Sequence, residues 1–110
     1  MQNIILVDSN NFDEVVLRNE KPVVFAIGAE WCADCRRAAP FYMAFAKEYD
    51  GRMVFTTADA EKSPELKERL DVRRIPTMII FKNGVAMEER LVEVKTPGEL
   101  KAFIEKGLAS

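Results

Sequence analysis

The stretch "AEWCADCRRAAP" (residues 29–40) contains the only two cysteines of the chain, Cys32 and Cys35. An almost wholly apolar run at 22–29 precedes the pair and an amphipathic segment at 33–49 follows it, so the pair is expected where a buried strand passes into a helix. Free N–H groups at the start of a helix favour an anion, and Cys32 is therefore expected to be the reactive thiolate. Cys35 lies one turn further along the same face, where it can form a disulfide with Cys32 and is expected to be the more covered sulfur.

The composition is that of a soluble globular protein, and it limits the possible functions. The 110 residues are enough for one domain, 1–110, and the net charge of −2 gives no reason to expect nucleic acid or an anionic membrane as partner. No apolar run approaches the roughly 20 residues that span a bilayer. The absence of histidine excludes cysteine–histidine nucleophile pairs and histidine metal sites, and two cysteines cannot complete a four-thiolate zinc site within one chain. We therefore expect no metal and no bound cofactor.

Hydrophobic patterning predicts an alternation of strands and helices. Strands are expected at 3–7, 22–29, 53–60, 77–81 and 85–94, the last two joined by a tight turn at Asn83-Gly84. Helices are expected at 10–19, 33–49, 63–70 and 96–108. Strands that are separated by helices pair in parallel through right-handed crossovers, and the tight turn adds an antiparallel strand. The predicted class is α/β, with a central mixed five-stranded sheet flanked by four helices.

Polar residues mark the starts of three predicted helices. Ser9 or Asn10 is expected to cap the first helix and Ser63 the third. Thr96 and Glu99 have the spacing of a capping box, which predicts that the last helix begins at residue 97.

Several motifs resemble those of the thioredoxin family. The segment "WCADC" (31–35) resembles the active site of that family, and Pro40 occupies the position of its helix-kinking proline, where a kink or break is expected. The segment "RRIPT" (73–77) matches the one that carries the cis-proline, here Pro76, and "FKNG" (81–84) matches the hairpin. The match follows the family's order along essentially the whole chain, which implies a thioredoxin fold.

The resemblance implies roles for the matching residues. Cys32 would attack a substrate disulfide, and Cys35 would resolve the mixed disulfide that forms. Pro76, in the cis form, would lie beside the sulfurs and present the backbone of Ile75 to an extended substrate, while Trp31 would form part of the docking surface. Further candidates for substrate binding are Arg74, Val92 and Glu93.

The resemblance also implies the setting in which the chain acts. It would be a monomeric dithiol reductant that reduces disulfide-containing proteins and receives electrons from a reductase such as a thioredoxin reductase. The first residues lack the pattern of a signal peptide, so we expect a cytoplasmic location.

The residues between the cysteines depart from the usual Gly-Pro of the family, because Ala33 and Asp34 stand there. A carboxylate beside two sulfurs should disfavour the thiolate through like-charge repulsion, which would stabilise the disulfide and make the pair more reducing. Three nearby cations could oppose this effect, namely Arg36, Arg37 and Arg74.

A second departure concerns the buried acid and lysine that thioredoxins usually place beneath the second cysteine. The matching positions here are Ala26 and Thr57, which form a neutral pair. Either this pair only packs better, or proton transfer to Cys35 passes to another group, for which Asp34 and Glu30 are the nearest candidates in sequence.

Two smaller departures affect the surroundings of the site. Gly28 stands where the family usually has an aromatic residue. The segment "LVEV" (91–94) replaces a glycine of the substrate groove, so Val92 or Glu93 is expected to narrow or recharge that groove.

Three alternatives to a general reductase stay open at this point. The chain could be a thioredoxin-like interaction or redox-sensing module with slow cysteines. The pair could be a structural disulfide, although a three-residue loop gains little stability from closure. Two copies of the chain could also share a metal ion or iron–sulfur cluster between their cysteine pairs.

Overall fold

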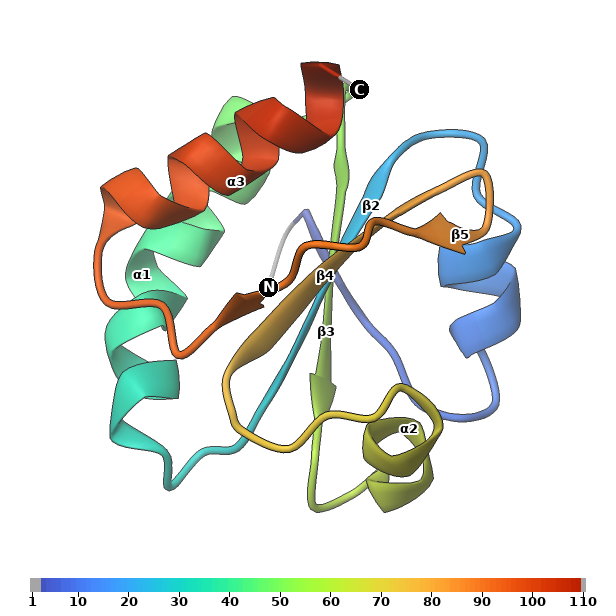
Figure 1. The fold of residues 1–110 in the computed structure, drawn as a ribbon, viewed down its shortest axis with the longest axis vertical. Coiled ribbons are helices and arrows are strands. Elements are labelled where there is room, and N and C mark those ends of the chain that lie inside the picture. The colour runs from blue at the N-terminus through green and yellow to red at the C-terminus, as the bar shows by residue number, and fades with distance from the viewer. Residues whose placement is uncertain (1–2, 110) are drawn as a thin grey trace.

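The apolar runs of the sequence form the centre of a mixed sheet. In the computed structural model, which describes residues 3–109, β2 (Val23–Gly28) lies between β3 (Val54–Asp59) and β4 (Thr77–Lys82) (Figure 1). β2 pairs in parallel with β3 and antiparallel with β4, and β1 (Ile4–Leu6) adds a parallel edge strand beside β3. Because both faces of β2 and β4 are covered, their sequences are apolar almost throughout rather than alternating.

The hairpin turn predicted at Asn83-Gly84 is confirmed. Both residues have positive φ, 53° and 81°, as a tight two-residue hairpin turn requires. The chain then returns as β5 (Val85–Ala86) and, after a break, as β6 (Leu91–Val92), and both pair with β4.

The continuous return strand predicted at 85–94 is therefore wrong. Between β5 and β6 the side chain of Arg90 donates to the carbonyls of Leu70 and Asp71, at 2.6 and 3.3 Å. These bonds satisfy carbonyls at the end of the preceding helix and draw the chain out of the ladder. The sheet follows the order β1-β3-β2-β4-β5, with β6 as a sixth strand on β4, so the mixed five-stranded core is confirmed with one short addition.

Four helices cover the two faces of the sheet, as predicted. On one face, α1 (Ala33–Glu48) and α3 (Pro97–Ala109) pack over a cluster that includes Val24, Phe55 and Ile80. On the opposite face, the single-turn π-helix η1 (Asp13–Leu17) and α2 (Pro64–Arg69) pack over the alternate residues of the same strands. Figure 1 shows the two pairs of helices on either side of the central strands.

The predicted caps have mixed outcomes. The capping box of α3 is confirmed: Glu99 N–H donates to Thr96 Oγ1 at 3.2 Å, and Thr96 N–H donates to the Glu99 carboxylate at 3.0 Å. Ser63 precedes α2 but makes no side-chain capping bond. The cap of the first helix is Phe12 rather than Ser9 or Asn10.

Helix α1 is anchored to the sheet through Tyr42. The buried Tyr42 hydroxyl donates to the carbonyl of Thr56 at 2.5 Å and lies 3.3 Å from that of Val24, so it contacts both central parallel strands. Burial raises the pKa of Tyr42 far above its usual range, which keeps the hydroxyl a hydrogen-bond donor. A kink or break was expected at Pro40, and α1 continues through this residue without a break.

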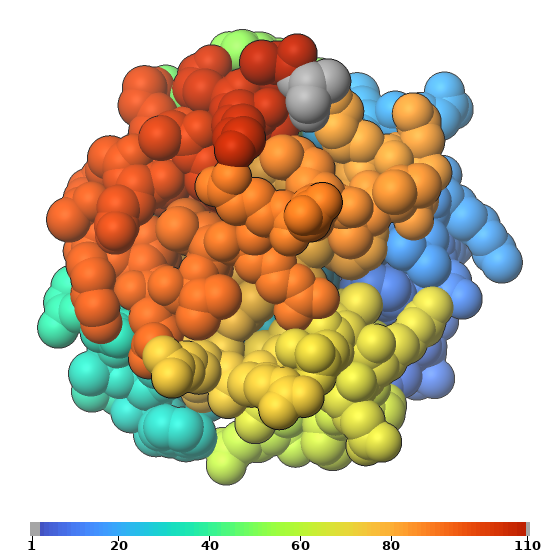
Figure 2. Space-filling view, viewed as in Figure 1, coloured from blue at the N-terminus to red at the C-terminus, as the bar shows by residue number. Residues whose placement is uncertain are grey.

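The C-terminal part of the chain covers one broad face of the molecule. In the space-filling view, the segment from β5 to α3, in orange, lies across the middle of this face, with α3 in red above it (Figure 2). The start of α1, in cyan, lies at the lower edge of the same face. Within residues 3–109, no helix combines the length and apolar character needed to cross a bilayer.

Candidate active site

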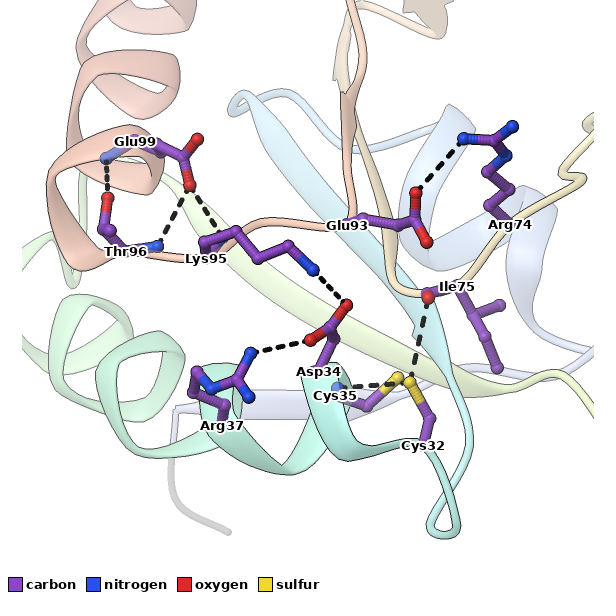
Figure 3. Close-up of polar contacts among 10 residues, drawn as sticks. All are labelled: Cys32, Asp34, Cys35, Arg37, Arg74, Ile75, Glu93, Lys95, Thr96 and Glu99. Carbon is purple, nitrogen blue, oxygen red and sulfur yellow. Dashed lines mark hydrogen bonds and ion pairs between the residues drawn. The ribbon is translucent and has the colours of Figure 1, made fainter.

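The first cysteine stands at the junction of β2 and α1, as predicted. Cys32 is the N-cap of α1, with φ −80° and ψ 118°, and its sulfur accepts the backbone N–H of Cys35 at 3.2 Å (Figure 3). The same sulfur lies 3.7 Å from the carbonyl oxygen of Ile75. The backbone N–H and the positive end of the helix can stabilise negative charge on this sulfur, whereas in the contact with Ile75 the protonated thiol is the donor.

The second cysteine is more accessible than expected. Cys35 is half-buried, whereas Cys32 is only 7% exposed, so the prediction that Cys35 would be the more covered sulfur is wrong. The reason lies in the small residues next to it, since neither Gly28 nor Ala26 has a side chain that could cover the sulfur. Partial burial, followed by the contact with Cys32, nevertheless raises the pKa of Cys35 to about 12, so this thiol stays protonated near neutral pH.

Two openings meet at Cys35. A cavity of about 110 Å³ extends from Cys35 under α1 past Ala26 and Met78, and is mainly apolar. A surface hollow of about 440 Å³ extends from Cys35 toward Glu30 and Asp59. Both are lined by the same four residues, namely Gly28, Cys35, Ala39 and Thr57. Ala26 and Thr57 are register partners on β2 and β3, so the positions of the missing acid–lysine pair form part of the cavity wall.

Asp34 points away from the sulfurs and toward two cations (Figure 3). Its carboxylate accepts from Lys95 at 2.5 Å and from Arg37 at 2.7 Å, and its side chain is 20% exposed. The hydrogen bond from Lys95, more than any other contact, lowers the pKa of Asp34. The lowered pKa makes Asp34 a weak base, and its two oxygens are already paired with Arg37 and Lys95, so it is disfavoured as the group that takes a proton from Cys35.

The expected balance of charge around Asp34 is partly corrected. Three cations were expected to oppose its effect on the thiolate. Arg37 pairs with Asp34 itself, whereas Arg36 donates to the Glu30 carbonyl and Arg74 pairs with Glu93. Sequence reasoning missed Lys95, which is 61 residues away along the chain. The capping box of α3 explains its position, since the Glu99 carboxylate also accepts the backbone N–H of Lys95 at 2.6 Å.

The remaining candidates lie around the Cys32 side of the site. Trp31 is 62% exposed, and Ala33 is exposed on the first turn of α1. The Ile75–Pro76 peptide bond is cis, and the Pro76 carbonyl accepts the N–H of Glu93 at 2.8 Å. These contacts bring Cys32, Ile75 and Pro76 together at one edge of the sheet.

An ion pair between Arg74 and Glu93 borders the Cys32 side of the site. Arg74 Nη1 lies 3.3 Å from Glu93 Oε1, and Val92 is 43% exposed beside them. Glu93 has φ 55°, a conformation that glycine adopts more easily than any other residue. Among residues 3–109, no three side chains of the His, Cys, Asp or Glu type converge to hold a metal ion.

Comparisons with known proteins agree with the geometry. The thioredoxin family model matches residues 3–106. Thioredoxin from Acidithiobacillus ferridurans is 31% identical over 105 residues, with 96% of each chain covered. The chloroplastic thioredoxin M5 of rice (Oryza sativa subsp. japonica) is 32% identical over 110 residues, as is the M-type thioredoxin of spinach (Spinacia oleracea) over 103. The chain spans 63% and 56% of the length of these two plant relatives. From the sulfur pair, the mixed sheet and the match along residues 3–106, the chain belongs to the thioredoxin family.

Proposed function

We propose that the protein is a thiol–disulfide oxidoreductase that reduces disulfides in other proteins. The observation that carries this proposal is the placement of Cys32 Sγ at the start of α1, where it accepts the Cys35 N–H at 3.2 Å beside the Ile75 carbonyl. This arrangement favours a thiolate nucleophile with a second thiol within reach. Membership of the thioredoxin family supports the same activity.

The reaction proceeds in two exchange steps. The Cys32 thiolate attacks one sulfur of the substrate disulfide, forms a mixed disulfide and releases the other substrate sulfur as a thiolate. Cys35 then loses its proton and attacks Cys32, which forms the Cys32–Cys35 disulfide and releases the second substrate thiolate. Two electrons pass from the protein to the substrate.

The second step requires a proton acceptor for Cys35, because the pKa of this thiol is raised to about 12. Asp34 is held by Lys95 and Arg37 and is already ionised, with its pKa lowered. Cys35 opens instead onto the hollow that Glu30 also lines. We assign the proton to water in this hollow or to the departing substrate thiolate.

The docking surface in this proposal comprises Trp31, Ile75 and Pro76, with the Arg74–Glu93 pair and Val92 at its rim. The Ile75 carbonyl lies 3.7 Å from the sulfur of Cys32, which supports an approach of substrate from this side. The protein would act as a monomer in the cytoplasm and receive electrons from a dithiol reductase.

A slow redox-sensing module is the second candidate function. It is favoured by the low exposure of Cys32, 7%, and by the raised pKa of Cys35. Both features slow exchange with large substrates, since rates depend on access and on the thiolate fraction.

Insulin reduction in the presence of dithiothreitol separates the two functions. A reductase speeds the precipitation of insulin chains well above the dithiothreitol background, and Cys32→Ser abolishes the effect. Cys35→Ser should accumulate a mixed disulfide through Cys32, because the resolving thiol is missing. A wild-type rate equal to that of Cys32→Ser would contradict the reductase and favour the sensing module.

A further inference from the structure

The two cysteines differ in the openings that they line. Cys32 Sγ is covered by its contacts with Cys35 N–H and the Ile75 carbonyl, and Cys32 lines neither the cavity nor the hollow. Cys35 lines both. A reagent in the hollow therefore meets Cys35 without contacting Trp31, Arg74 or Glu93, none of which lines either opening.

The hollow has the size and lining of a small-molecule site. Its volume of about 440 Å³ falls within the range of roughly 300–1,000 Å³ that is usual for ligand pockets. Its lining includes small residues next to Cys35 and three charged residues, Glu30, Arg36 and Asp59. Arg36 also donates to the Glu30 carbonyl at 2.8 Å, and Asp59 accepts the N–H of Glu61 at 2.8 Å. These charges match a ligand that carries both carboxylate and ammonium groups.

The opening beside Cys35 depends on the absence of a side chain at Gly28. The backbone of Gly28 lies so near Cys35 that a Cβ added there would be 2.7 Å from the sulfur. Any larger residue at position 28 would displace the sulfur or close the opening. Thr57, the register partner of Ala26 on β3, lines the same hollow.

We propose that the hollow binds a low-molecular-weight thiol, such as an amino-acid or short-peptide thiol, which reduces the oxidised protein by attacking Cys35 rather than Cys32. This inference rests on the proposed function, since it assumes that a Cys32–Cys35 disulfide forms during turnover. It adds a route of electron entry that avoids the face on which protein substrates would dock.

The chemistry balances with two molecules of thiol. The first thiolate attacks Cys35, breaks the Cys32–Cys35 bond, forms a mixed disulfide on Cys35 and releases Cys32 as a thiolate. The second thiolate attacks the bound small-molecule sulfur, which releases the small disulfide and leaves Cys35 to take a proton. Two electrons pass from the two thiols to the protein.

The stability of the departing thiolate also favours attack on Cys35. Attack on Cys35 releases Cys32, whose anion is stabilised by the start of α1 and by the Cys35 N–H. Attack on Cys32 would instead release Cys35, whose pKa is raised to about 12. Access through the hollow and the N–H contact that stabilises a departing Cys32 anion therefore both favour attack on Cys35.

Trapping of the first intermediate tests the proposal directly. The oxidised wild-type protein is mixed with L-cysteine, quenched with acid within the reduction half-life, and alkylated with N-ethylmaleimide. Fragment ions between Ala33 and Asp34 then locate the added cysteine and the maleimide. The expected result is cysteine on Cys35 and maleimide on Cys32, and a majority of the reverse pattern overturns the proposal.

A blocking variant provides a second readout. Ala39 is exposed, lines both openings and has no part in the proposed docking surface, so Ala39→Met should slow reduction by L-cysteine by about fivefold or more through lost access. Ala44 is exposed on the same helix and lines neither opening, so Ala44→Met is the matched control. Reduction is followed by the fluorescence of Trp31, the only tryptophan. Equal rates for the two folded variants contradict the proposal.

Insulin reduction with the same proteins separates this inference from the proposed function. When it is reduced beforehand and freed of dithiothreitol, Ala39→Met should form the mixed disulfide with insulin at the wild-type rate, because this first step takes place at Cys32 and needs neither a small thiol nor the hollow. If wild type fails to reduce insulin but carries cysteine on Cys35, the proposed function fails and the entry route stands. If wild type reduces insulin and carries cysteine on Cys32, the reverse holds.

Discussion

The backbone of Gly28 lies directly against the sulfur of Cys35, at the distance where a Cβ would be 2.7 Å from Cys35 Sγ. This contact links the last residue of β2 to the first turn of α1. It holds the resolving thiol close to the sheet while leaving it open to the hollow.

Gly28→Ala should therefore disturb the second cysteine more than the first. We expect the free energy of unfolding to fall by about 1–3 kcal/mol, because an added methyl group overpacks this contact. Displacement of Cys35 should also slow resolution, so that a mixed disulfide with substrate accumulates. Urea unfolding and trapping with acid measure the two effects.

Gly98→Ala is the control for that substitution. Gly98 is exposed, and the nearest atom to an added Cβ is Thr96 Oγ1 at 4.0 Å, so the free energy of unfolding should change by no more than about 0.5 kcal/mol. A similar loss of stability in both variants would show that the contact with Cys35 is not the cause.

Asp34→Asn should alter the dependence of stability on pH. The pKa of Asp34 is lowered in the folded protein, chiefly by Lys95, so its ionised form stabilises the fold above its ordinary value of 3.8. This contribution is lost as the pH falls through the lowered value. Urea unfolding across the acid range should show a wild-type advantage over Asp34→Asn above pH 3.8 that vanishes in stronger acid. A difference that persists unchanged in acid would contradict the ion-pair assignment.

The contribution of Cys35 to the free energy of unfolding should show the opposite dependence on pH and fall at alkaline pH. Its pKa is raised from 9.0 to about 12 in the folded protein, so the fold favours the protonated thiol. The resulting stabilisation is fully present below 9.0 and is lost as the pH rises from there to about 12, because the unfolded chain ionises first. The stability of wild type relative to Cys35→Ala should fall over this interval, as measured by urea unfolding of the reduced proteins. A constant difference would contradict the raised pKa.

Glu93→Gly should stabilise the protein and open the rim of the proposed docking surface. Glu93 has φ 55°, which costs a residue with a side chain roughly 1–2 kcal/mol, whereas the exposed Arg74–Glu93 pair contributes at most about 1 kcal/mol. We expect a net gain of up to about 1 kcal/mol by urea unfolding, together with faster insulin reduction.

Glu93→Gln distinguishes the backbone effect from the charge. It removes the ion pair and keeps the strained backbone, so it should be no more stable than wild type. If Glu93→Gln is stabilised as much as Glu93→Gly, repulsion or desolvation at Glu93 rather than its φ angle is responsible.

Most of the fold could be predicted because its signals are local. The turn at Asn83-Gly84 and the capping box at Thr96 and Glu99 each depend on residues within one turn of chain, and both are confirmed. The return strand at 85–94 was mispredicted because Arg90 forms its bonds with the end of α2, far away in sequence.

In the site as well, features that depend on neighbouring residues could be predicted, and features that depend on distant contacts could not. The position of Cys32 at a helix start could be predicted from the apolar run before it, and the structure places it there. Lys95 could not be found as a partner of Asp34, because the contact depends on where α3 begins relative to α1. The exposure of Cys35 was mispredicted because it depends on side chains that are absent, at Ala26 and Gly28, rather than on residues beside it in the chain.

The Tyr42 hydroxyl has a mechanical consequence for the redox cycle. It fastens α1 to the carbonyls of Val24 and Thr56 about two turns beyond Cys35, while the first turn of the helix borders an open hollow. Beyond Tyr42, the end of the helix that carries both sulfurs is held by the exposed Asp34–Lys95 ion pair and by the approach of Gly28 to Cys35 rather than by a buried bond to the sheet. Making or breaking the bond between the two sulfurs can move that end alone. Amide hydrogen exchange in β2 and β3 should then be the same in the oxidised and reduced proteins, with the difference confined to the first turn of α1.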